Sequence, residues 1–356
     1  MGIDMKKFIC SVALVILGLN VAAGEGSLPA RPTVDKRVEI MSIVFRLAGK
    51  NEYTSQAYKN YTDRIESHFG ALREHELIKY IRSRMYRQGL GYDAVMSMAV
   101  HLDSNLNLRS DITPDNLDSR WRRDSLTEFT SLLSKFRKDS HFDEFFAANE
   151  SLYSEAVERF VPLFERLDLG WFKEFFGEES GGGFTIIIAL GNGGNNYGAS
   201  VAYRDGTKAA YALMGTWSVD AEGKPLYQDK GYFPILIHEF CHTFVNHLNV
   251  KYEELFREKG EKIFASVEAK MRQQAYGHWR IVLNEALVRA SVIMYMREHN
   301  YPGEAIQNEI NAQVARGFYW IEALADELER YSHERYIYPT LDSFMPELAE
   351  AYKGFP

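Results

Sequence analysis

The stretch Pro234 to Val250 reads PILIHEFCHTFVNHLNV and contains His238, Glu239 and His242 in the pattern His-Glu-x-x-His. On an α-helix, residues four apart lie one turn from each other on the same face, so both imidazoles can reach one ion. Glu239, next to His238, can then face a water molecule on that ion. The pattern predicts a helix that binds zinc and places a general base beside it.

The other side of this stretch is apolar, with Leu236, Phe240 and Phe244 at helical spacing, and Pro234 is expected in the first helical turn. A helix of this kind suits the floor of a cleft. The alternative interpretation is a core helix with two hydrogen-bonded histidines. It is less favoured because it gives the neighbouring carboxylate neither a purpose nor a partner.

A catalytic zinc site needs a third protein ligand, and two glutamates compete for this place. Glu261 has a suitable spacing but lies in the charged run REKGEKIF, whereas Glu285 lies in the apolar run IVLNEALV. A buried carboxylate is costly unless it is paired or binds a metal, so we favour Glu285. The competing partner for Glu285 is Arg289, one helical turn away. His247 points away from His238 if the helix continues.

The composition is that of a globular protein, with 356 residues of which 46% are hydrophobic and 25% charged. The formal net charge is −8. Nucleic-acid binding needs a basic surface, so we expect no nucleic-acid partner.

Residues 1–23 have the pattern of a secretory signal: Lys6 and Lys7, an apolar stretch from Phe8 to Val21, and small residues at 21–23. The protein is therefore expected to be exported, to the periplasm or the extracellular space. The apolar stretch is short for a membrane span and no later run is longer, so no span is expected after signal removal. Of the two cysteines, the mature chain keeps Cys241, which is expected to be a small core residue.

The rest of the chain divides at residue 177. Residues 24–176 have helical periodicity with few glycines or prolines, and residues 177–356 begin with a glycine-rich change in composition. Three strands are expected at 184–190, 199–203 and 208–216, with a polar, flexible loop at 191–198 and an Asp-Gly hairpin turn at 205–206. Together these patterns predict a mostly helical α+β fold, with a small antiparallel sheet ahead of a helical core. The two regions can also form one compact unit.

The segments HEFCH (238–242) and NEALVRA (284–290) resemble the gluzincin zinc metallopeptidases, the thermolysin-like superfamily, whose third zinc ligand is a glutamate preceded by asparagine. The whole mature chain also resembles secreted proteins of unassigned function from Bacteroidetes. The resemblance implies a zinc ion held by His238, His242 and Glu285, with Glu239 as general base.

Two departures from the superfamily pattern stand out. The gap between the second histidine and Glu285 is long, and Arg289 stands where related enzymes have an acidic residue that orients a histidine ligand. Asn246 or a backbone carbonyl is a candidate for that orienting role.

These features predict a secreted zinc metallopeptidase that acts on a peptide or protein substrate. A further donor should stabilise the oxyanion, and Tyr336, Tyr338 and His333 are candidates because they follow the ligand helix in the chain. Two alternatives remain open. One is a zinc-containing binding or adhesin-like protein, and the other is a metal-dependent amidase that acts on cell-wall or glycan substrates.

Overall fold

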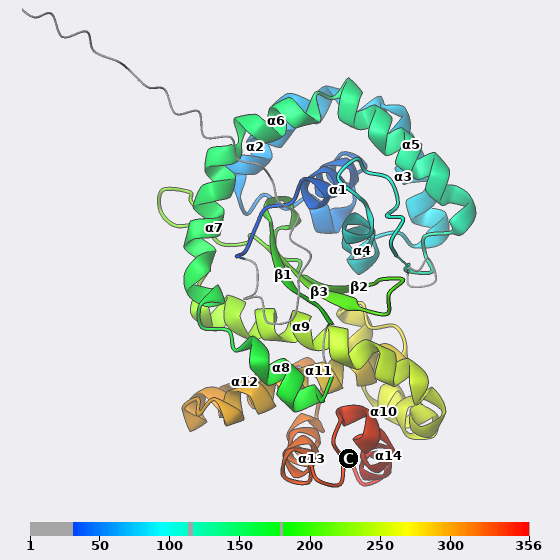
Figure 1. Ribbon diagram of the computed structural model, residues 1–356, viewed down its shortest axis with the longest axis vertical. Coiled ribbons are helices and arrows are strands. Elements are labelled where there is room, and N and C mark those ends of the chain that lie inside the picture. The colour runs from blue at the N-terminus through cyan, green and yellow to red at the C-terminus, as the bar shows by residue number, and fades with distance from the viewer. Residues whose placement is uncertain (1–30, 113–116, 179–180, 356) are drawn as a thin grey trace, which may run out of the picture.

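A three-stranded sheet lies at the centre of the molecule (Figure 1). The computed structural model describes residues 31–112, 117–178 and 181–355, so the signal predicted at 1–23 lies outside the described residues. The strands are β1 (Gly181–Ala189), β2 (Tyr197–Ala202) and β3 (Lys208–Gly215), and their order in the sheet is β1-β3-β2. All three predicted strands are present, with bounds shifted by up to three residues.

The sheet is mixed, which corrects the prediction of an antiparallel sheet. β2 and β3 form the predicted antiparallel hairpin, whose turn places Gly206 at φ +90°. β1 pairs with β3 in parallel, with Thr185 opposite Tyr211. After β1 the chain forms β2, which is not adjacent to β1 in the sheet. β3 then lies between the two and pairs with both. The mostly helical α+β class is confirmed.

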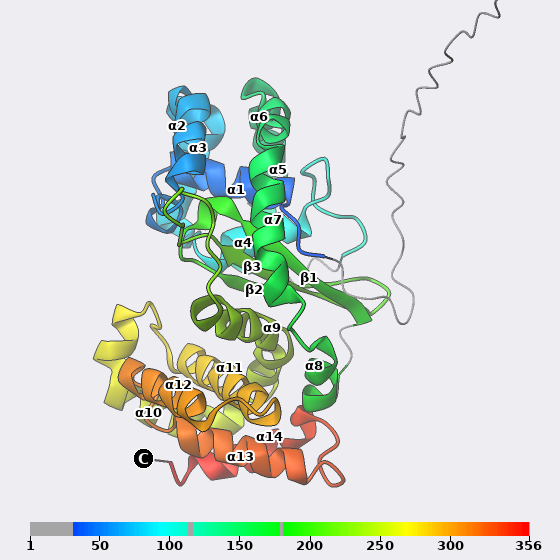
Figure 2. The ribbon, with the colours of Figure 1, turned by 90° about the vertical axis from the view of Figure 1, so that its left-hand side faces the viewer.

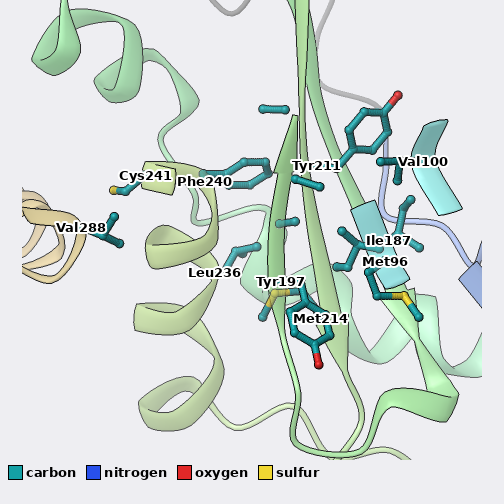
Figure 3. Packing of buried hydrophobic residues seen from close by; sticks show 14 of the residues in the cluster. Met96, Val100, Ile187, Tyr197, Tyr211, Met214, Leu236, Phe240, Cys241 and Val288 are labelled. Carbon is teal, nitrogen blue, oxygen red and sulfur yellow. The ribbon is translucent and has the colours of Figure 1, made fainter. Parts of the chain in front are cut away.

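Helices cover both faces of the sheet. α1 (Lys36–Leu47) and α4 (Asp93–His101) pack on one face, and α9 (Asp229–Lys251) packs on the other. Figure 3 shows Leu236 and Phe240 of α9 directed at the sheet, with Met96 of α4 on the opposite side. The predicted apolar face of the histidine helix is therefore the face that packs on the sheet.

Except for the last of them, which lies beside α9, the remaining N-terminal helices curve around this centre (Figure 1). They are α2 (Lys59–Phe69), α3 (Glu76–Gln88), α5 (Arg123–Asp139), α6 (Phe142–Ala148), α7 (Glu150–Phe164) and α8 (Leu169–Phe176), with short 3₁₀ turns at Asn51–Tyr53, Gly70–Glu74 and Leu190–Asn192. α8 packs against α9 through aromatic rings, with Phe176 and Phe244 stacked at 4.7 Å between centroids. The four aromatic residues of α8, Trp171, Phe172, Phe175 and Phe176, are buried and belong to the core.

The C-terminal helices lie together on the side of α9 that faces away from the sheet (Figure 2). They are α10 (Glu253–Gln273), α11 (Trp279–Glu298), α12 (Gly303–Arg316), α13 (Ile321–His333) and α14 (Leu341–Tyr352). α11 packs along α9 and is covered by α10, α12 and α13. None of the helices in the described residues combines the length and apolarity that a membrane crossing requires.

The loop between β1 and β2 is packed into the molecule, although its composition predicts a polar surface loop. Gly191 and Gly193 are buried, and a Cβ on either would come within 2.5 Å of Ser42 or Ser55. Asn192 is fully buried. Because glycine has no Cβ, the backbone of the loop can approach these serines closely. A residue with a side chain at either position would not fit.

α9 begins earlier than expected, which corrects the position of Pro234. The helix starts at Asp229, and Pro234 lies inside it instead of in its first turn. The extra turn is stabilised by Tyr232, which is buried and stacks on Trp217 with 3.4 Å between the ring centroids. The Tyr232 hydroxyl also accepts a hydrogen bond from the backbone N–H of Trp217. This packing outweighs the backbone hydrogen bond that proline removes.

Candidate metal centre

Two antiparallel helices bring the predicted ligands together. α9 carries His238 and His242, and α11 carries Glu285. The two Nε2 atoms are 3.1 Å apart. Glu285 Oε1 lies 3.4 Å from His242 Nε2, and Oε2 lies 3.6 Å from His238 Nε2. Residues 43 positions apart in the sequence therefore meet at one point.

The packing of α11 on α9 explains this meeting. The Asn249 side chain donates a hydrogen bond to Asn284 Oδ1 at 2.7 Å, near the end of α9, while Phe233 and Tyr295 are ring neighbours near its start. Between these two contacts, Cys241 faces Val288 of α11 (Figure 3). Cys241 is fully buried and is the free cysteine of the described residues, as expected of a core residue.

The spacing of the three donor atoms fits a zinc ion. Zinc binds histidine nitrogen and carboxylate oxygen at about 2.0–2.2 Å in tetrahedral geometry, which places neighbouring donor atoms about 3.3 Å apart. His242 Nε2 is 3.1 Å from His238 Nε2 and 3.4 Å from Glu285 Oε1, and both separations lie close to this value. The second oxygen of Glu285, Oε2, lies 3.6 Å from His238 Nε2. Two imidazoles and one carboxylate are also a donor set found in catalytic zinc sites. The residues present therefore fit the metal.

A hydrogen bond on the far side of His242 sets its tautomer. His242 Nδ1 lies 3.0 Å from Asn246 Oδ1, and the same oxygen accepts a hydrogen bond from Asn284 Nδ2 at 2.7 Å. Because Oδ1 can only accept, His242 carries its proton on Nδ1 and keeps the Nε2 lone pair for a metal. Asn246, predicted as a possible orienting residue, thus holds His242 in the tautomer whose Nε2 can bind a metal.

The protonation states of the other two ligands also suit metal binding. Burial lowers the pKa of His238 well below its ordinary value, so its imidazole is neutral. For Glu285, burial alone would raise the pKa, but interactions with its neighbours, of which the Arg289 charge is the largest, outweigh burial and lower the pKa to about 2. A neutral imidazole and an ionised carboxylate are the forms that ligate metals.

Glu239 lies beside His238 and His242, and no salt bridge joins it to a cation among the residues that the structure describes. One of its carboxylate oxygens forms a group with a ring nitrogen of His238 and of His242, and these atoms all lie within 4.8 Å of one another. The residue is 6% exposed, and burial raises its pKa to about 7, opposed by His242 and the Gly198 N–H. A carboxyl group with this pKa can accept and release a proton near neutral pH.

Glu261 and His247, the two residues considered and not favoured as ligands, lie away from the three favoured ones. Glu261 is exposed on α10. His247 is 3.3 Å from Glu178, on the side of α9 that faces α8 and away from the metal ligands.

The three candidates for the oxyanion donor are not brought to the site. Tyr336 is 85% exposed between α13 and α14, Tyr338 packs against Phe344, and His333 is exposed at the end of α13. Among the described residues, no hydrogen bond, ion pair or ring contact joins any of them to the metal ligands.

One residue of the site, Tyr276, was missed. Its hydroxyl donates a hydrogen bond to Glu285 Oε2 at 3.0 Å from the connection between α10 and α11. The surrounding sequence, QQAYGHW, carries no metal-site pattern, so only the fold of these two helices reveals the contact. Arg289 also forms an ion pair with Glu285, at 2.8 Å. From the sequence, this pair is expected only as an alternative to metal binding.

Comparison with curated proteins and with solved structures gave no match. One family, described as Domain of unknown function (DUF4932), matches residues 32–351. The match spans both regions that the composition separates at residue 177, and it includes His238, His242 and Glu285. Because it covers most of the chain, the protein belongs to the DUF4932 family.

Proposed function

We propose that the protein is an exported zinc-dependent metallopeptidase that hydrolyses peptide bonds. The observation that carries this proposal is the meeting of His238 Nε2, His242 Nε2 and the two Glu285 carboxylate oxygens, with separations of 3.1–3.6 Å and with Glu239 beside them. The resemblance of both helices to gluzincins supports the same activity.

The residues of the chain have separate tasks in this reaction. When bound by the three ligands, zinc would lower the pKa of a water molecule to about 7 and polarise the substrate carbonyl. Glu239 takes a proton from the attacking water onto its carboxylate and delivers it to the nitrogen of the leaving amine. Asn246 keeps His242 in the tautomer that ligates through Nε2.

The composition of the site favours a catalytic zinc over a structural one. Structural zinc sites are usually closed by four protein ligands, most often including cysteines, whereas catalytic sites use three and leave one position open. Here three ligands converge, and Cys241 faces the core instead. An adjacent buried carboxyl group such as Glu239 has a use only if a proton must move.

The position of β2 favours a peptide as substrate. β2 is an outer strand of the sheet and, among the described strands, pairs with β3. Its residue Gly198 lies directly against α9 at Glu239 and His242. An extended peptide can add to such a strand through main-chain hydrogen bonds, which would lay its backbone beside the metal ligands.

The test is cleavage of a peptide library by the mature protein loaded with zinc. The wild type and a Glu261→Gln control should cleave the same peptides, and Glu239→Gln should cleave none while retaining zinc. Zinc binding without cleavage of any peptide by the wild type would refute the peptidase. Release of acyl groups from cell-wall or glycan amides would then identify the amidase, and no turnover of either class would favour the binding protein.

Export is a separate part of the proposal and has its own test. The amino-terminal sequence of the protein recovered outside the cytoplasm should begin after residue 23. Recovery of the intact amino terminus in the cytoplasmic fraction alone would refute export.

A further inference from the structure

The two oxygens of the Glu285 carboxylate have different surroundings. Oε2 accepts hydrogen bonds from Arg289 Nη2 at 2.8 Å and from the Tyr276 hydroxyl at 3.0 Å. Arg289 Nη2 also donates to the Tyr276 hydroxyl oxygen at 3.0 Å, so a hydrogen bond joins the two donors to each other. Each oxygen also faces one imidazole: Oε2 lies 3.6 Å from His238 Nε2, and Oε1 lies 3.4 Å from His242 Nε2. The difference is that the two hydrogen-bond donors both bind Oε2.

This asymmetry decides which oxygen is available to a metal. A carboxylate oxygen has about two lone-pair directions, and two donors occupy both of them on Oε2. We infer that Arg289 and Tyr276 are positioning residues that restrict Glu285 to binding the metal through Oε1 alone. The inference rests on the proposed metal site and deepens it, because it says how one coordination position is kept open.

Other contacts hold the two donors in place, so they do not move with the carboxylate when it binds a metal. Arg289 is 7% exposed, and its Nη1 donates to Gln313 Oε1 at 2.9 Å. Its guanidinium lies over the ring of Phe318 at 5.0 Å. The backbone N–H of Tyr276 donates to Met271 O at 2.9 Å, which fixes the start of the connection that carries the hydroxyl.

The consequence concerns the open position of the site. Three protein ligands and one exchangeable position make up a four-coordinate catalytic zinc. If both oxygens of Glu285 bound the ion, the carboxylate would take up space that water and the substrate carbonyl need. Arg289 and Tyr276 prevent this by engaging Oε2, and an acidic residue in place of Arg289 could not do so.

The experiment measures coordination number in protein loaded with Co²⁺, whose visible absorption is strong in four-coordinate sites and weaker in five-coordinate ones. Arg289→Met and Tyr276→Phe remove the two donors. Matched controls lie on the same helix: Arg297→Met removes ion pairs to Asp326 and Glu329, and Tyr295→Phe removes a hydroxyl that accepts the Asp168 N–H. Metal content and thermal unfolding of each variant accompany the spectra.

The wild type and both controls should show the strong four-coordinate spectrum at one Co²⁺ per chain. Tyr276→Phe should lose part of the absorption intensity and Arg289→Met more, because the freed Oε2 adds to the coordination sphere. If Arg289→Met does not fold, Tyr276→Phe decides. An unchanged spectrum in Tyr276→Phe at full metal content, or a five-coordinate spectrum in the wild type, would overturn the inference.

Failure of this inference can be told from failure of the proposed function. A wild type that binds no Co²⁺ and no zinc would refute the metal site and the inference with it. A wild type with the expected spectra that cleaves no peptide would refute only the peptidase activity.

Discussion

Gly198 of β2 is a point of close approach between the sheet and α9, and replacing it by alanine should disturb the site. A Cβ at this position would lie 2.2 Å from the backbone oxygen of Glu239 and 3.0 Å from His242 Cβ. Ordinary contact requires the strand and helix to separate by about 1 Å. Forced contacts of this kind typically cost about 1–3 kcal/mol of stability.

The effect on metal binding should be larger than the effect on stability. A shift of about 1 Å would move His238 and His242 relative to Glu285 on the other helix, whereas zinc–ligand distances tolerate only about 0.2 Å. We therefore expect Gly198→Ala to fold with a lowered Tm and to lose most of its zinc on dialysis. The control is Gly303→Ala at the start of α12, where a Cβ meets no atom within 4 Å. Zinc content and Tm equal to the wild type in Gly198→Ala would refute the reasoning.

Three further predictions concern a buried acid, the orientation of a ligand, and the metal itself. Glu39 is fully buried, accepts hydrogen bonds from Tyr61 and the Leu190 N–H, and burial raises its pKa to about 7. The stabilising contribution of Glu39 is complete below about pH 4.5 and is lost as the pH rises to about 7. The free energy of unfolding of Glu39→Gln should therefore rise by about 3 kcal/mol relative to that of the wild type across this range. Denaturant unfolding at several pH values measures this, and parallel pH profiles would contradict it. Asn246→Ala should weaken zinc binding about 10–100-fold in chelator competition, and His247→Ala should not; equal affinities would remove the orienting role. Chelation of the metal should lower the wild-type Tm, because zinc binds the folded state, and an unchanged Tm would argue against a folded-state site.

The parts of the site that could be predicted from sequence depend on local or energetic rules. The one-turn spacing of His238 and His242 follows from helix geometry, whatever the rest of the fold. Glu285 could be chosen over Glu261 because a carboxylate in an apolar run must find a partner. The structure brings Glu285 to the histidines and leaves Glu261 exposed.

Tyr276 could not be found in this way. Its hydroxyl reaches Glu285 only because α10 and α11 fold back on each other, and no periodicity encodes that turn. The same limit applies to the role of Arg289. Sequence spacing shows that it can pair with Glu285, but not that it occupies one carboxylate oxygen and leaves the other for a metal.

The errors in the fold also involve contacts between distant residues. The β-branched run of β1 predicts a strand but not its partner, so the parallel pairing with β3 was missed. The loop after β1 is polar and glycine-rich, which is typical of the surface. Its glycines instead permit the close approach to Ser42 and Ser55 that buries it.

The most direct test of the metal centre is the zinc content of the purified mature protein and two variants. The wild type should contain about one zinc per chain, Glu285→Ala should lose nearly all of it, and Glu239→Gln should retain it because Glu239 is a base and not a ligand. Zinc at the wild-type level in Glu285→Ala, or none in the wild type, would contradict the site proposed for this protein.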